Sequence, residues 1–70
     1  MSNQVVKEYE SVFIEMNNLC KEHANDRFNV FFPVFRNALW EMGSRCGVDG
    51  STFYSMWTDY NKANNIKISR

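Results

Sequence analysis

Residues 42–57 decide how this chain folds, and they read Met42-Gly43-Ser44-Arg45-Cys46-Gly47-Val48-Asp49-Gly50-Ser51-Thr52-Phe53-Tyr54-Ser55-Met56-Trp57. Gly47 can adopt the left-handed backbone conformation that ends a helix, because it has no Cβ to clash there. The carboxylate of Asp49 can then accept hydrogen bonds from the unpaired amides of a following helix. The stretch therefore predicts a helix that ends near Cys46, a tight turn at Gly47 and a second helix that starts near Gly50.

A small residue, Gly43, lies four positions before the turn glycine. Phe53 and Met56 follow the turn three residues apart, on one face of the second helix. This layout resembles the helix-turn-helix of many DNA-binding domains, and the resemblance covers residues 42–57 without identifying a particular family. A glycine inside a helix costs about 1 kcal/mol relative to alanine. Gly43 therefore indicates that another stretch of backbone comes close to this helix, as at a crossing of helices.

The rest of the chain also has helical periodicity. Apolar residues recur at spacings of three and four between residues 3 and 24, which predicts a first helix with a wide apolar stripe. Pro33 disfavours helical geometry at Phe32 and is well suited to the first position of a helix. We therefore expect a connection at 27–32 and a second helix at 33–46. A third helix is expected at 50–63, and no segment alternates long enough to require a strand. The stripe of the first helix consists of Val5, Val6, Tyr9, Val12, Phe13, Met16, Leu19, Cys20 and His23. The inner face of the second helix consists of Phe35, Ala38, Leu39, Met42 and Cys46. That of the third helix consists of Phe53, either Met56 or Trp57, and Tyr60.

The predicted architecture is thus a single all-α domain over residues 1–70, with a helix-turn-helix-like second and third helix. A chain of 70 residues buries only about 60% of the surface that its unfolded form exposes. A second copy of the chain would add burial, so we expect a homodimer. The net charge is zero, but residues 1–26 hold two lysines against five acidic residues, whereas residues 27–70 hold six basic residues against three acidic ones. The acidic first part and basic second part suit a module that presents its second half to an anion.

The sequence favours one function, DNA binding, and leaves a second open as its alternative. In the first, the helix-turn-helix-like pair binds double-stranded DNA as a small regulator, plausibly encoded by a phage or mobile element, since nine asparagines are compatible with an AT-rich genome. The resemblance implies that the first residues of the third helix meet base edges while basic side chains meet phosphates. Yet the expected reading face carries no Arg, Asn or Gln, the residues that make bidentate contacts to purines. The expected DNA-binding residues are Arg36, Arg45, Ser51, Tyr54, Ser55, Thr58 and Lys62.

In the second function, the chain is a small adaptor or inhibitor that docks on a larger protein. Eleven aromatic residues in 70 exceed what three short helices readily bury on their inner faces. Exposed aromatic side chains are typical anchors of protein interfaces. The expected interaction residues are Phe31, Phe32, Trp40, Tyr54 and Trp57.

Other functions find little support in the sequence. Cys20 and His23 lie three apart and Cys46 is the only other cysteine, so a fourth ligand for a zinc site is not evident. No nucleophile elbow, phosphate-binding glycine loop or credibly spaced carboxylate pair is present, so we expect no catalysis, cofactor or small-molecule substrate. No signal peptide or membrane-spanning stretch is recognisable, and with only two cysteines the expected location is the cytoplasm.

Overall fold

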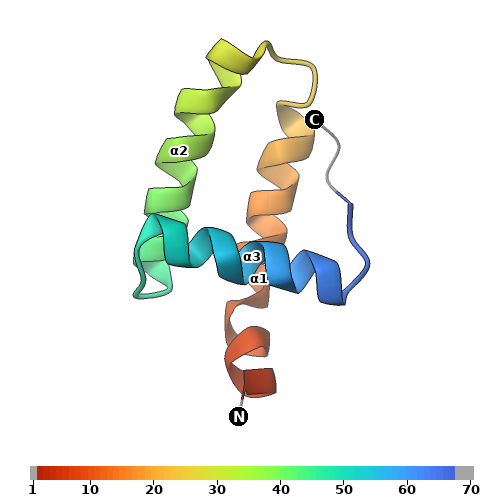
Figure 1. The fold of residues 1–70 in the computed structure, drawn as a ribbon, viewed down its shortest axis with the longest axis vertical. Helices are drawn as coiled ribbons and strands as arrows, with labels where there is room; N and C mark the ends of the chain where they lie inside the picture. The colour runs from red at the N-terminus through yellow and green to blue at the C-terminus, as the bar shows by residue number, and fades with distance from the viewer. Residues whose placement is uncertain (1, 68–70) are drawn as a thin grey trace.

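Three helices in two layers form the computed structural model, which describes residues 2–67 and the side chains of residues 9–67. They are α1 (Ser2–Glu22), α2 (Phe28–Arg45) and α3 (Gly50–Ala63). Helices α1 and α2 run side by side in opposite directions, and α3 lies crosswise over one face of this pair (Figure 1). The all-α, three-helix architecture expected from the sequence is confirmed. Within the described residues, no helix combines the length and the apolar character that a membrane crossing requires.

The apolar stripe of α1 faces the other two helices. Met16, Phe13 and Cys20 are almost fully buried, and Tyr9 and Leu19 pack at the edge of the same core. The side chains of Val5 and Val6, which the sequence assigns to this stripe, lie outside the described residues. The core also takes its members from α2, the turn after it and α3, and its buried apolar residues are Val12, Phe13, Met16, Cys20, Phe31, Ala38, Met42, Cys46, Phe53, Trp57 and Tyr60.

Helix α2 begins at Phe28, so the prediction of a connection at 27–32 and a helix start at Pro33 was wrong. Pro33 lies inside the helix, where it supplies no amide for a hydrogen bond. The turn before it forms nonetheless, because the carbonyl of Arg27 accepts hydrogen bonds from the amides of Val30 and Phe31. Phe31 is 5% exposed and belongs to the core. Its burial outweighs the local preference of proline for a helix start.

The turn between α2 and α3 has the geometry that the sequence predicts. Gly47 has a φ of 76°, in the left-handed region. The amide of Val48 donates to the carbonyl of Gly43 at 2.8 Å and the amide of Gly47 to that of Ser44 at 3.1 Å, which together form a Schellman motif. Asp49 caps α3, since its Oδ1 accepts a hydrogen bond from the amide of Thr52 at 2.8 Å.

Gly43 is needed at the place where this turn folds back on α2. A Cβ at this position would lie 2.9 Å from the carbonyl oxygens of both Val48 and Asp49. Contacts this short essentially never occur for real Cβ atoms, and both neighbours are backbone atoms. The expected close approach is therefore present, but the backbone that approaches belongs to the turn itself and not to a crossing helix.

A buried polar cluster joins α1 to α3. The side-chain amides of Asn17 and Asn61 bond each other reciprocally, at 2.9 and 3.0 Å. The indole Nε1 of Trp57 donates to Oδ1 of Asn17 at 2.7 Å. Nearby, the hydroxyl of Tyr60 donates to Glu10 at 2.9 Å, again between α3 and α1. Among the described side chains, every buried nitrogen and oxygen atom has a hydrogen-bond partner.

Candidate functional site

An open groove with aromatic walls separates the first half of α2 from α3. Its volume is about 640 Å³. We call it the aromatic groove, and its described lining consists of Cys20, Phe28, Phe31, Phe32, Phe35, Tyr54, Trp57, Thr58, Asn61, Lys62, Asn65, Ile66 and Lys67. All three helices and the segment after α3 thus contribute to one concave surface.

Helical spacing places the rings of the α2 wall. Phe28 and Phe32 are four residues apart and stack with their centroids 5.2 Å apart. Phe31 and Phe35 are also four residues apart and form a tilted pair at 5.3 Å, three positions further along the helix. These two rows exist only because α2 continues upstream of Pro33. Because the sequence pattern placed the start of this helix at Pro33, it did not predict this wall of the groove.

Rings from α3 complete the groove. Tyr54 meets Phe35 edge-on at 6.3 Å, and Trp57 lies 5.9 Å from the same ring. Tyr54 and Trp57 are themselves 6.0 Å apart. One α2 side chain, Phe35, thus links the rows of both helices. The sequence assigned it to the core, and it is in fact half-buried at the groove floor.

The depth of each ring separates a floor from a rim. Phe31 and Trp57 are each 5% exposed, so the expectation that their rings are exposed was wrong, whereas the alternative that Trp57 belongs to the buried stripe of the third helix is confirmed. Both belong to the core, because α2 starts earlier than expected and the indole nitrogen of Trp57 bonds within the buried polar cluster. Phe28, Phe32 and Tyr54 are 67%, 41% and 45% exposed and form the rim.

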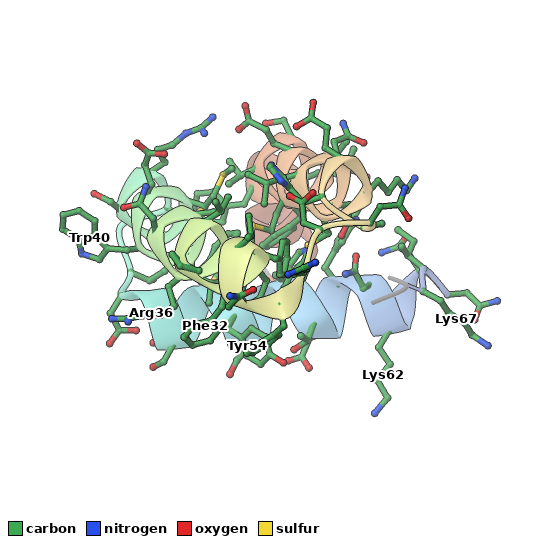
Figure 2. All side chains as sticks on the ribbon, turned by 90° about the horizontal axis from the view of Figure 1, so that it is seen from above. Phe32, Arg36, Trp40, Tyr54, Lys62 and Lys67 are labelled. Atoms are coloured by element: carbon green, nitrogen blue, oxygen red, sulfur yellow. The ribbon has the colours of Figure 1, made fainter. Side chains whose placement is uncertain are left out.

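Trp40 is exposed but does not belong to the groove. It is 71% exposed and lines a smaller hollow of about 340 Å³ on α2, together with Pro33, Arg36 and Asn37. In Figure 2 it points outward, well away from Tyr54 and Lys62. Of the five expected interaction residues, the structure therefore brings Phe32 and Tyr54 together at the rim, with Phe31 and Trp57 beneath them.

The charge at the groove is positive. Lys62 and Lys67 belong to its lining, which contains no aspartate or glutamate among the described residues. The guanidinium of Arg36 lies 5.9 Å from the centre of the Phe32 ring, within range of a cation–π contact. Figure 2 shows Arg36, Phe32, Tyr54 and Lys62 on the side of the molecule where α3 lies, whereas α1 is on the opposite side.

The expected DNA-reading flank of α3 is open to solvent. Ser51, Tyr54 and Ser55 are exposed, as is Lys62. Thr58 is only half-exposed, and its hydroxyl donates to the carbonyl of Ser55 at 3.0 Å. The flank and the groove rim therefore share Tyr54 and Lys62.

Two observations distinguish the expected phosphate contacts. Arg36 is exposed on the α3 side, but the guanidinium of Arg45 donates to Glu15 of α1 at 2.6 Å. The structure therefore does not bring Arg45 together with the other expected DNA-binding residues. Asp49 lies at the start of α3. Hydrogen bonds from the side chain of Thr52 and, to a smaller extent, from the backbone of Thr52 hold the pKa of the Asp49 carboxyl below the ordinary value. A negative charge thus persists at the end of α3 that would approach DNA.

The surroundings of Cys46 disfavour reactive chemistry. Burial raises the pKa of the Cys46 thiol, an effect that the neighbouring charge of Arg45 only partly opposes. The thiolate that a nucleophile or metal ligand requires is therefore disfavoured there. Within the described part of the chain, no three His, Cys, Asp or Glu side chains lie where they could hold a metal ion. The ring of His23 instead contacts the carboxylate of Asp26 at 2.7 Å.

Comparison of the chain with protein-family models, with curated proteins and with solved structures gives no match.

Proposed function

We propose that this protein is a non-catalytic binding module that docks on a larger protein through the aromatic groove. The observation that carries the proposal is the cluster of exposed rings Phe28, Phe32 and Tyr54 around a concave apolar floor. Solvent-exposed rings forfeit the burial that would otherwise favour folding, about 25 cal/mol per Å² of apolar surface. A contiguous apolar patch in a hollow is the usual form of an interaction site, and aromatic anchors supply much of the binding energy there.

DNA binding is the second candidate, and a specific observation favours it. Helices α2 and α3 are joined crosswise by a glycine turn with the hydrogen bonds of a Schellman motif, and Ser51 and Ser55 face solvent after it. Arg36 and Lys62 are available on the same side for phosphate contacts. Asp49 and Asp59 work against this candidate, because both carboxylates are exposed on or next to α3. The docking proposal rests on the apolar rings of the groove, whose described lining contains no acidic residue, and it is therefore the main one.

Affinity capture from the source cells tests the docking proposal. Wild-type chain should retain one protein in stoichiometric amount, and nuclease treatment should leave that amount unchanged. Phe32→Ser should lose the protein, because it removes an exposed ring from the groove rim without touching the core. Ile14→Ser is the matched control, since Ile14 is 45% exposed on α1 and does not line the groove. Equal capture by both variants would contradict the proposal.

Titration of the purified chain with duplex DNA of random sequence tests the second candidate. DNA binding through Arg36 and Lys62 should weaken with salt, with a log–log slope of about −2 for two phosphate contacts. Lys62→Ala should then weaken binding to all sequences and reduce that slope by about 1. Phe32→Ser should have little effect on it. Absence of binding at low salt, where phosphate contacts are strongest, would remove DNA from consideration.

A further inference from the structure

We propose that the partner segment that fills the aromatic groove is an acidic amphipathic helix. The inference rests on the docking function proposed above and specifies the chemistry of the partner. Three properties of the groove carry it: the spacing of its rings, the sign of its charge and the helical nature of its walls.

The rings of the groove form a surface that suits side chains spaced by one helical turn. Phe28 and Phe32 stack along α2, and the Phe31–Phe35 pair runs beside them towards Tyr54. Each row therefore repeats every four residues, at about 6 Å along the helix. A partner helix with apolar residues at positions i, i+3 or i+4, and i+7 presents side chains at a matching interval.

The charge of the groove selects an acidic partner. Lys62 and Lys67 lie in its lining, Arg36 stands over the outer ring Phe32, and no described lining residue is acidic. Asp49 and Asp59, at the start of α3 and on it, lie outside the lining, and Glu15 of α1 is paired with Arg45. Carboxylates on the flanks of the partner's apolar face would meet Lys62, Lys67 and Arg36 at the rim, which favours both encounter and correct orientation.

The walls favour a helix over an extended segment. They consist of α2, α3 and part of α1, whose backbone amides and carbonyls are bonded within their own helices. No strand edge is present among the described residues to pair with an extended peptide. An extended segment would therefore bury peptide groups without partners, whereas a helix satisfies its own backbone hydrogen bonds.

A second copy of the chain is a poorer occupant. Its acidic helix α1 has the right charge, but among the described side chains Ile14 is the only large hydrophobic residue exposed on it. One anchor leaves most of the ring surface uncovered. A separate partner with several apolar anchors fits the groove better.

Selection from a displayed library of random peptides, each long enough for about four helical turns, tests this proposal. The full chain is the target, and the enriched peptides should carry net negative charge with apolar residues at helical spacing. A synthesised member should gain helicity by circular dichroism when it binds. Its affinity should fall at least tenfold with Phe32→Ser and severalfold with Lys62→Glu, whereas Ile14→Ser should bind as wild type does. Tyr54→Ser serves as a second rim variant if Phe32→Ser proves unfolded by circular dichroism.

The alternative outcomes separate this inference from the proposed function. Groove-dependent binders that are neutral, basic or extended would overturn the acidic helix and leave the docking function standing. Binders unaffected by both rim variants would overturn both. Sedimentation equilibrium of the chain alone completes the test, because self-association that Phe32→Ser abolishes would assign the groove to a second copy and overturn the inference.

Discussion

Gly43 shows how one missing side chain permits the turn between α2 and α3. Alanine is normally the better helix residue by about 1 kcal/mol. At Gly43, however, the added Cβ would lie 2.9 Å from two carbonyl oxygens of the turn. We expect Gly43→Ala to lower the free energy of unfolding by about 1–3 kcal/mol, as overpacking does. Urea unfolding followed by circular dichroism measures the change.

Gly50→Ala is the matched control for this prediction. A Cβ there would lie 3.6 Å from the nearest atoms, which is ordinary contact distance. We expect the Gly50→Ala variant to be as stable as wild type or more stable, because alanine restricts the conformations of the unfolded chain more than glycine does. If the two variants unfolded alike, the close approach at Gly43 would not be the reason for a glycine there.

A second prediction at the scale of single residues concerns the paired side-chain amides of Asn17 and Asn61. Truncation of either residue to alanine leaves buried polar groups unpaired, at a cost of about 1–3 kcal/mol each. Asn17→Ala should cost more, because Oδ1 of Asn17 also accepts from Trp57. The double variant should lose less stability than the two single losses together, with a coupling of about 0.5–3 kcal/mol. Strictly additive losses in urea unfolding would show that the pair contributes nothing as a unit.

The sequence made some of these residues predictable and others not. Gly43, Gly47 and Asp49 could be assigned because each has a local conformational reason that depends only on nearby residues. Asn17 and Asn61 are 44 positions apart, and an isolated asparagine in a helix is ordinarily a surface residue. Only the packing of α3 on α1 gives each of them a buried partner.

At the scale of the helix, Pro33 makes α2 less stable than another residue at this position would. Proline inside a helix lacks the amide that would bond the carbonyl one turn earlier. Pro33 is exposed, so alanine there should restore this hydrogen bond without disturbing the core. We expect Pro33→Ala to raise the free energy of unfolding by about 1–3 kcal/mol. A less stable variant in urea unfolding would show that the proline stabilises the start of α2.

The cap of α3 should respond to pH. Hydrogen bonds from Thr52 lower the pKa of the Asp49 carboxyl in the folded chain below its ordinary 3.8. The stabilisation is therefore complete above pH 3.8 and is lost as the pH falls through the lower folded-state pKa. Asp49→Asn keeps a capping oxygen without the charge. The difference between wild type and this variant in urea midpoint should shrink as the pH falls below 3.8, and a constant difference would contradict the assignment.

The start of α2 shows where element prediction fails. The preference of Pro33 for a first helical position is a local property, and it suggested a connection at 27–32. The burial of Phe31 is a tertiary property, and it extends the helix to Phe28. The spacing of Phe28 with Phe32 and of Phe31 with Phe35 already indicated helix upstream of the proline. Local conformational preference is a weak guide when such a stripe can be buried.

At the scale of the whole molecule, the chain length favours a homodimer, but no described buried polar side chain requires a partner from a second copy. We therefore expect folding to need only one chain. The thermal midpoint should stay constant over about a hundredfold range of protein concentration. A midpoint that rises with concentration would show instead that a second copy adds burial to the folded state.

The three-helix architecture was predictable because hydrophobic periodicity and one turn motif determine which faces must meet. The aromatic groove was not, because it depends on where α3 lies against the first half of α2. No local pattern reports that placement. The exposed flank of α3 was predictable from its polar residues, but the division of the rings into floor and rim depends on how α2 and α3 pack against each other.

The amide pair between α1 and α3 also governs when the protein can complete its fold during synthesis. Asn17 leaves the ribosome 44 residues before its partner Asn61. Until Asn61 has been added, the apolar stripe of the nascent first helix is exposed, and the side-chain amide of Asn17 within it has no partner from α3. This stripe must therefore be covered by water or by a chaperone. A premature stop before Asn61 should therefore yield an unfolded product rather than a smaller version of the domain.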